Sequence, residues 1–132
     1  MRTTLRLLAV SLLVLVAAIA CAADAPPEIK TLSPEALRAR LEKAPRPMLV
    51  DVREQNEWDE AHIADATLAP LDTVVDKMKG VTKDREILLI CRSGRRSGIA
   101  YTKLAERGFT NLRNVEGGMI AWQKLGYPVI KK

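Results

Sequence analysis

The residues best suited to chemistry lie in the segment CRSGRRS, residues 91–97, which contains one thiol. A cysteine attacks other molecules as its thiolate, and nearby cations or backbone N–H groups favour that charged form. Three arginines follow the thiol at close spacing: Arg92, Arg95 and Arg96. This composition predicts that Cys91 is a reactive nucleophile. The alternative is an inert cysteine at the end of a buried strand, but arginine and serine neighbours disfavour an apolar site.

The position of Cys91 along the chain indicates how its thiolate would be stabilised. Cys91 follows the apolar run Ile87 to Ile90, and we expect a helix to begin near Arg96. In a strand-to-helix turn of this kind, backbone N–H groups point inward and bind an anion, and the helix dipole and the arginines add to the effect. A pKa about two below the ordinary 8.5 would make the thiolate dominant near neutral pH. The loop residues expected to do this are Arg92, Ser93, Gly94, Arg95 and Arg96.

Two other thiolate designs compete with this interpretation. Tyrosine phosphatases use the spacing C-x5-R, in which the loop encircles a phosphate and the arginine binds it through two hydrogen bonds. The spacing from Cys91 to Arg96 is C-x4-R, and the smaller ring favours a compact sulfur-bearing substrate. Thioredoxin-like chemistry needs a C-x-x-C pair, which the sequence lacks. A thiolate phosphatase therefore remains a disfavoured alternative.

The elements that would position the thiol alternate along the chain. Short apolar runs at residues 48–50, 87–90 and 111–115 are typical of buried parallel strands. Helical spacing of apolar residues follows Ser33, which is expected to cap a helix beginning at Pro34, and recurs over residues 71–78 and 100–105. The alternation predicts an α/β fold, with a central parallel sheet of about five strands and helices on both faces.

Three side chains should meet at the carboxyl edge of this sheet, where ligands bind in open α/β folds. Asp51, Cys91 and Glu116 each follow a predicted strand. We expect Arg96 to support the loop with Asp51 as its partner across adjacent strand ends. Arg53 and Glu57, which are four residues apart, are expected to pair locally and to brace the site.

The histidine and the tryptophans have no predicted role in chemistry. His62 is the only histidine, and a structural role is expected in preference to general-base catalysis. Trp58 and Trp122 are expected in the core or in a pocket wall. Gly117 and Gly118 are expected to open the last helix beside the cleft.

Residues 1–22 have the layout of a secretory signal, with Arg2 and Arg6 ahead of an apolar run and small residues after it. The run from Leu7 to Ala20 is shorter than the roughly 20 residues of a spanning helix, so removal of the signal is favoured over a retained anchor. Residues 23–31 are expected to form a linker, and residues 32–132 a single domain.

Two cleavage points remain open, and they lead to different locations. Ala20-Cys21-Ala22 fits an ordinary cleavage site, whereas Ala18 to Cys21 resembles a lipoprotein signal that ends before Cys21 and places a lipid on it. The protein is therefore expected to be exported and periplasmic, and to reach a membrane only if Cys21 is lipidated. Either outcome leaves Cys91 as the single thiol of the mature domain.

Composition and charge exclude several classes of protein. The formal charge of +5 falls to +3 once Arg2 and Arg6 are removed with the signal, and the remaining charges are interspersed. This is no signature of a nucleic-acid-binding protein. We expect a monomer without a metal ion or cofactor, whose basic loop attracts a small anion.

Three motifs resemble those of the rhodanese family of sulfurtransferases in its single-domain form. The pattern C-x-x-G-x-R-[ST] matches Cys91 to Ser97, an upstream D-V-R motif matches LVDVREQNEWDEAHI, and a closing motif matches GGMIAWQKLGYPV. The resemblance spans about residues 33–129. Two positions depart from it, since Ala61 and Asp65 stand where the family has glycine, and they put the local turn geometry in doubt.

The resemblance implies a sulfurtransferase with the rhodanese-like fold. Cys91 would take the outer sulfur of a small anionic donor such as thiosulfate, hold it as a persulfide, and pass it to a thiol, to cyanide or to a protein acceptor. The alternative is a sulfur carrier or docking module that holds persulfide for one protein partner without turnover of small donors.

Overall fold

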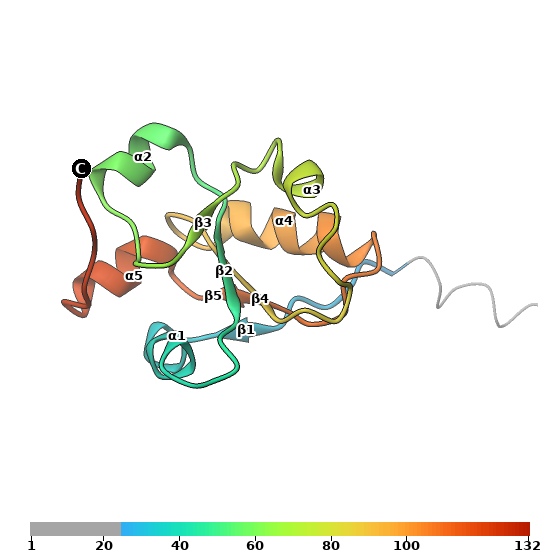
Figure 1. Ribbon diagram of the computed structural model, residues 1–132, viewed down its shortest axis with the longest axis horizontal. Coiled ribbons are helices and arrows are strands. Elements are labelled where there is room, and N and C mark those ends of the chain that lie inside the picture. Colours follow the sequence, from blue (N-terminus) through green and yellow to red (C-terminus); the bar gives the residue numbers. More distant parts are fainter. Residues whose placement is uncertain (1–24) are drawn as a thin grey trace, which may run out of the picture.

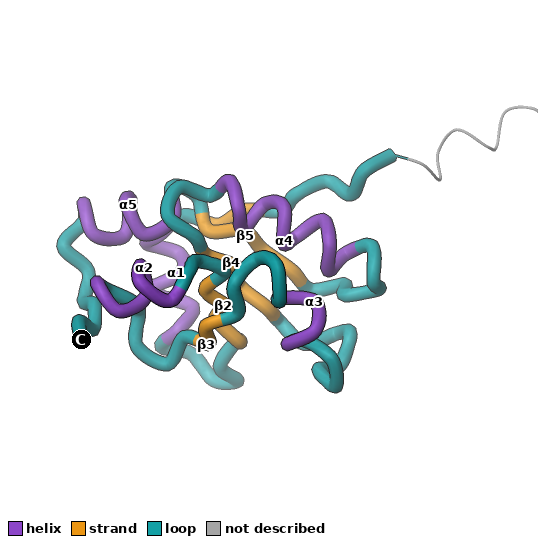
Figure 2. The backbone as a smooth tube through the Cα atoms, turned by 90° about the horizontal axis from the view of Figure 1, so that it is seen from above, coloured by secondary structure: helices purple, strands orange, loops and turns teal. Residues whose placement is uncertain are grey.

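The computed structural model describes residues 25–132, so the predictions on the signal and on Cys21 lie outside the described residues. Five parallel strands form one sheet in the order β1-β5-β4-β2-β3 (Figures 1 and 2). The strands are β1 (Thr31–Leu32), β2 (Met48–Asp51), β3 (Thr67–Leu68), β4 (Ile87–Ile90) and β5 (Leu112–Val115). The helices are α1 (Pro34–Leu41), α2 (Gln55–Glu60), α3 (Val74–Lys77), α4 (Arg95–Ala105) and α5 (Gly118–Lys124). The predicted α/β fold with a parallel sheet of about five strands is confirmed.

The central strand β4 supplies both halves of the core. Ile87 and Leu89 pack into a cluster with residues of α3 and α4, and Leu88 and Ile90 pack into a second cluster with residues of α1 and α5. All four side chains are fully buried, as expected for a strand covered on both faces by helices. This burial fixes the end of β4, and so the start of the segment that carries Cys91.

Local sequence signals decide some boundaries and not others. Ser33 caps α1 as predicted, because its hydroxyl oxygen accepts a hydrogen bond from the N–H of Ala36 at 3.1 Å. The helix predicted over residues 71–78 is shorter than expected: α3 is preceded by a turn in which the N–H of Thr73 donates to the carbonyl of Pro70 at 2.8 Å.

The two departures from the family motifs do not disturb the turn. Ala61 has an extended backbone, with φ −167°, which any residue adopts. Asp65 has φ +62°, in the left-handed region, where a glycine is favoured and aspartate is among the better tolerated alternatives. Its carboxylate also accepts a hydrogen bond from Arg46 at 2.8 Å. The chain therefore keeps a left-handed turn here without a glycine.

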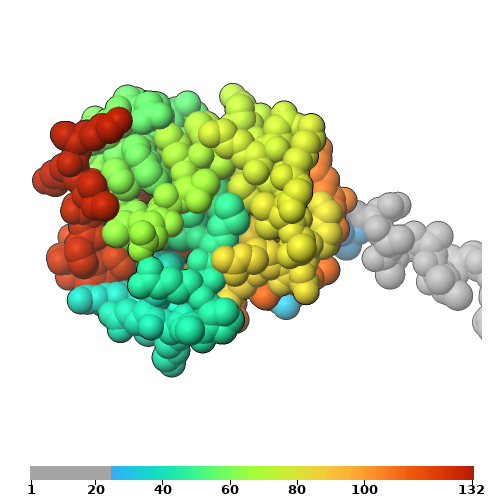
Figure 3. All heavy atoms as spheres, in the orientation of Figure 1, coloured from blue at the N-terminus to red at the C-terminus, as the bar shows by residue number. Residues whose placement is uncertain are grey.

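The last residues of the chain lie against α2 and the loop that follows it (Figure 3). His62 and Ile130 form a short antiparallel bridge through two backbone hydrogen bonds of 2.9 and 2.7 Å. The N–H of Lys132 donates to the carbonyl of Asp59 at 3.0 Å. Within residues 25–132, no helix is long and apolar enough to cross a membrane.

Candidate active site

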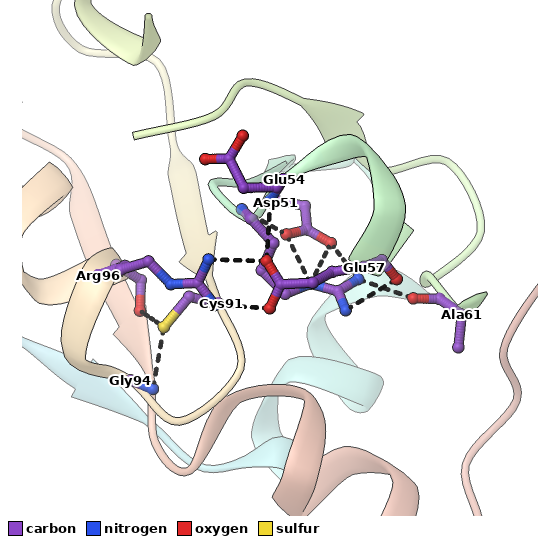
Figure 4. Close-up of polar contacts among 9 residues, drawn as sticks. Asp51, Glu54, Glu57, Ala61, Cys91, Gly94 and Arg96 are labelled. Atoms are coloured by element: carbon purple, nitrogen blue, oxygen red, sulfur yellow. Dashed lines mark hydrogen bonds and ion pairs between the residues drawn. The ribbon is translucent and has the colours of Figure 1, made fainter. Parts of the chain in front are cut away.

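Cys91 is the first residue after β4, and a short loop carries the chain from it into α4. Its side chain is buried, with only 1% of the residue's surface exposed. The sulfur accepts two hydrogen bonds, from the backbone N–H of Gly94 at 3.1 Å and from the hydroxyl of Ser97 at 3.2 Å (Figure 4). The loop therefore closes around the sulfur and leaves little room for a bulky reactant.

Backbone carbonyls of the loop are held away from the sulfur by neighbouring elements. The first turn of α5 donates two N–H groups, from Met119 to the carbonyl of Cys91 at 2.8 Å and from Ile120 to that of Arg92 at 3.1 Å. The side-chain amide of Asn114, on β5, donates to the carbonyl of Gly94 at 3.0 Å. Because these carbonyls point away from the sulfur toward their donors, the N–H groups of the loop point toward the sulfur.

Two glycines permit this close approach. Gly94 has φ +101° and makes a left-handed turn just before α4, which a glycine adopts without strain. Gly118, with φ +54°, begins α5 as expected, and a Cβ atom there would lie 2.3 Å from the carbonyl oxygen of Cys91. A side chain at position 118 would thus push α5 away from the loop.

The environment lowers the pKa of the Cys91 thiol below its ordinary value. Burial alone raises that pKa, but the hydroxyl of Ser97 and the backbone N–H groups of Ser97, Gly94 and Ser93 outweigh it by stabilising the thiolate. Of the three arginines expected to contribute, Arg96 does so through its charge: its pKa is raised mainly by Glu57 and, to a lesser degree, by the charge of Cys91. Arg92 and Arg95 are exposed to solvent, and neither bonds the sulfur.

Ser97 is the functional residue that the sequence reasoning missed. The motif includes Ser97 only as its last position, but the residue is fully buried and its hydroxyl donates a hydrogen bond to the sulfur. The available signal was its position three residues after Gly94, in the first turn of a helix that begins at the loop. A hydroxyl there faces back toward the residue that opens the loop.

Arg96 is held by Glu57 and not by Asp51, so the predicted pairing of Arg96 with Asp51 is wrong. Its two terminal nitrogens donate to the two carboxylate oxygens of Glu57, each at 2.7 Å (Figure 4). These hydrogen bonds lower the pKa of Glu57 to about 2, against a smaller opposing effect of burial, and the N–H of Glu54 adds to the lowering. The pair ties α2 to the first turn of α4.

Asp51 pairs instead with Arg53, two residues along the chain. Arg53 donates to both carboxylate oxygens of Asp51, the shortest contact being 2.7 Å, and both side chains are buried. Arg53 and Glu57 do pair locally, but through the backbone of Glu57 and not its carboxylate: Arg53 bonds the backbone carbonyls of Glu57 and Ala61 at 3.2 and 2.7 Å. Arg53 therefore holds α2 by its backbone at the end of β2.

The remaining predicted residues lie around this network. The ring of His62 stacks on Trp58 with centroids 3.8 Å apart, and its Nδ1 lies 2.8 Å from the carbonyl of Trp58, a structural arrangement. Trp122 is buried in the core. Glu116 accepts a hydrogen bond from the hydroxyl of Thr31 at 2.6 Å, whereas the hydrogen bonds to the Cys91 sulfur come from Gly94 and Ser97.

Other candidate binding features lie away from the thiol. Among residues 25–132, no three side chains of His, Cys, Asp or Glu gather closely enough to hold a metal ion. A cavity of about 340 Å³ lies between α1, the loop after α2 and α5, and no residue of the segment 91–97 lines it. The hydrogen bonds to Cys91 support the chemistry of a stabilised thiolate.

Comparison with known proteins decides the family. The model of the rhodanese-like domain matches residues 33–125. The chain belongs to the rhodanese-like domain family. A sulfurtransferase of Allochromatium vinosum is 33% identical over 102 residues, which cover 77% of this chain and 95% of that protein. YtwF of Bacillus subtilis, provisionally named a sulfurtransferase, is 42% identical over 96 residues, which cover 73% of this chain and 92% of that protein.

Solved structures agree with this assignment. The rhodanese-like domain of the Anabaena protein Alr3790 superimposes with a TM-score of 0.73 at 25% identity, and the match covers 80% of this chain and 81% of that one. A rhodanese-like domain protein of Staphylococcus aureus gives a TM-score of 0.70 at 30% identity, with coverage of 79% and 99%. This rhodanese-like domain therefore shares its fold with small proteins of similar extent, and its relatives support sulfur transfer as the general activity.

The pair of Glu57 with Arg96 predicts an acid-sensitive stability. The folded pKa of Glu57 is about 2 against an ordinary 4.5, so the pair stabilises the fold fully above about pH 4.5 and loses its effect as the pH falls toward 2. Glu57→Gln should lower the free energy of unfolding by about 1–2 kcal/mol at pH 7. The difference from wild type should shrink below pH 4, as measured by urea denaturation. An equal loss at pH 7 and pH 3 would contradict the assignment, and Asp76→Asn, in an exposed ion pair, is the matched control.

The hydrogen bond from Ser97 predicts a change in thiol reactivity. Ser97→Ala should raise the pKa of the Cys91 thiol, because the thiolate loses a hydrogen-bond donor. The measurement is the rate of alkylation by iodoacetamide as a function of pH. Ser93→Ala is the control, since it keeps the backbone N–H and removes only an exposed hydroxyl. An unchanged profile for Ser97→Ala would show that the hydroxyl does not stabilise the charge.

Proposed function

We propose that this domain is a thiosulfate sulfurtransferase that carries sulfur as a persulfide on Cys91. In the first half-reaction, the Cys91 thiolate attacks the outer sulfur of thiosulfate, the S–S bond of thiosulfate breaks, and sulfite leaves with the bonding electron pair. In the second, an acceptor such as cyanide takes the outer sulfur and the Cys91 thiolate is restored. The two steps together predict ping-pong kinetics.

The observation that carries the proposal is the buried sulfur that accepts hydrogen bonds from Gly94 and Ser97. These donors stabilise negative charge on the attacking sulfur, and later on the persulfide, and the charge of Arg96 adds to their effect. The exposed guanidinium groups of Arg92 and Arg95 flank the loop and attract an anionic donor. The narrow loop favours a donor whose reactive sulfur is terminal and unhindered, as in thiosulfate.

The state of Arg96 argues against phosphatase chemistry. A thiolate phosphatase needs an arginine free to bind two phosphate oxygens. Both terminal nitrogens of Arg96 are occupied by Glu57, and the loop is one residue shorter than the phosphatase loop. A relative from Pseudomonas entomophila that is named a thiosulfate sulfurtransferase is 33% identical over 102 residues. This similarity supports a sulfur donor, and not a phosphate ester, as the substrate.

A sulfur carrier remains the second candidate, and one relative favours it. YrkF of Bacillus subtilis, provisionally named a sulfur carrier protein, is 35% identical over 94 residues that cover 51% of its length. A carrier would hold persulfide on Cys91 for a protein partner and turn over small donors no faster than a free thiol. The rate with thiosulfate separates the two functions.

We also propose export of the protein from the cytoplasm. The support is the layout of residues 1–22, in which two arginines precede an apolar run and small residues follow. In an oxidising compartment, burial would protect the thiolate from thiol–disulfide exchange, because a bulky disulfide cannot easily reach the sulfur.

Replacement of the nucleophile tests the activity. Cys91→Ser should abolish thiocyanate formation from thiosulfate and cyanide, a loss of at least 1,000-fold expected for removal of a covalent nucleophile. Circular dichroism and the unfolding midpoint should stay close to those of wild type. Activity retained in Cys91→Ser would refute the assigned nucleophile. Wild-type rates no better than free thiol would favour the carrier, and release of phosphate from an aryl phosphate would favour the phosphatase.

The intact mass of the protein purified from its native host tests export and lipidation. Cleavage after Ala22 should give a mature chain that begins at Ala23, whereas a lipoprotein should begin at a diacylated Cys21. An added mass of about one sulfur atom that is lost on treatment with cyanide would identify a resting persulfide. A full-length, unprocessed chain would contradict the proposal of a removed signal.

A further inference from the structure

We propose that the surface beside the thiol loop docks a protein sulfur acceptor that presents acidic and apolar side chains next to its thiol. This inference rests on the proposed persulfide chemistry and names the acceptor class of the same site. The acceptor surface consists of two arginines and three isoleucines, Arg92, Arg95, Ile29, Ile99 and Ile120.

The charge of the acceptor surface is uncompensated. Arg92 and Arg95 are exposed, and within the described chain no carboxylate lies within ion-pair distance of either. Arg96, by contrast, is neutralised by Glu57. Two free cations beside the sulfur complement acidic side chains on a partner, and they speed its encounter with the loop.

Exposed isoleucines lie on either side of these arginines. Arg95 and Ile99 are four residues apart on α4, so they share one face of that helix. Ile29 lies next to this face, since its Cδ1 is 3.6 Å from the position of a Cβ at Gly98. Ile120 projects from the first turn of α5, where its N–H bonds the carbonyl of Arg92. Each isoleucine has at least 40% of its surface exposed.

Small reactants do not explain these isoleucines. Thiosulfate and cyanide have no apolar surface to bury, so the three exposed isoleucines contribute nothing to their binding. A polypeptide that places one apolar side chain beside Ile99 gains from burial, and its acidic side chains pair with the arginines. An anionic membrane has the same two features, but it carries no thiol to receive sulfur.

The persulfide makes the buried sulfur reachable by such a partner. Its outer sulfur lies one S–S bond, about 2 Å, beyond Cys91 Sγ. The acceptor thiolate attacks this outer sulfur, the S–S bond to Cys91 breaks, and the electron pair returns to Cys91 as thiolate. The acceptor leaves as a persulfide, so no external oxidant or reductant is needed.

The test compares sulfur transfer from wild type to three synthetic peptides and to cyanide, with thiosulfate as donor. One peptide has a single cysteine flanked by aspartates and followed by leucine. The second replaces the aspartates with asparagines, and the third replaces the leucine with serine. Because acidic neighbours raise the pKa of the peptide thiol, kcat/KM is expressed per thiolate. The aspartate and leucine peptide should exceed each of the others at least tenfold, and the advantage of its aspartates should fall with added salt.

Ile99→Gln is the diagnostic variant, and Leu125→Gln is its control. Leu125, at the end of α5, is 44% exposed, close to the 41% of Ile99. Ile99→Gln should remove most of the advantage given by leucine and leave transfer to cyanide unchanged, whereas Leu125→Gln should alter neither.

The outcomes separate this inference from the proposed function. Equal kcat/KM for all three peptides, or equal effects of the two variants, would overturn the acceptor surface while transfer to cyanide continued. Failure to form thiocyanate with wild type would overturn the proposed function itself. A third outcome combines two results: wild type binds anionic phosphatidylserine vesicles and Ile99→Gln does not, while no peptide is preferred as acceptor. This outcome would overturn the acceptor surface and would assign it to membrane binding.

Discussion

The direction of four backbone groups is the constraint on which the site depends. The carbonyls of Cys91, Arg92 and Gly94 are bound from outside by α5 and Asn114, and the N–H of Gly94 consequently faces the sulfur. A peptide group that turned over would place a carbonyl dipole beside a thiolate and would destabilise it. Gly118 is part of the same constraint, because only a residue without Cβ lets α5 reach these carbonyls. Charge on the sulfur is therefore stabilised mainly by fixed donors of the loop, with a further contribution from the charge of Arg96.

Polar contacts, and not apolar burial, hold α2 in place beside this loop. None of its residues is buried, which is unusual for a helix that supports a reactive group. It is fixed from one side by Arg53, which bonds its backbone, and from the other by the bidentate pair of Glu57 with Arg96. The buried pair of Asp51 with Arg53 gives Arg53 its orientation. Such contacts are directional, so they define the position of α2 more sharply than they stabilise it.

The sequence predicted those features that depend on local pattern. The apolar runs of β2, β4 and β5 identified three buried strands, and the thiol loop followed from their spacing and from Gly94. Strands β1 and β3 have two residues each, too short for any periodic signal, and α2 has no apolar stripe to reveal it. The carboxylate partner of Arg96 was predicted wrongly, and the carboxylate that binds Arg53 was not foreseen, because a charge pattern along the chain cannot rank several carboxylates. Which carboxylate each arginine contacts depends on where α2 packs in the folded chain.

The bridge between His62 and Ile130 lies just after the end of α2. Residues 130–132 hold the end of α2 through backbone hydrogen bonds, since Lys132 also bonds the carbonyl of Asp59. Glu57 sits on the same short helix and orients Arg96 at the mouth of the thiol loop. Loss of the hydrogen bonds made by Ile130 and Lys132 would therefore loosen the end of α2, the helix whose Glu57 orients Arg96.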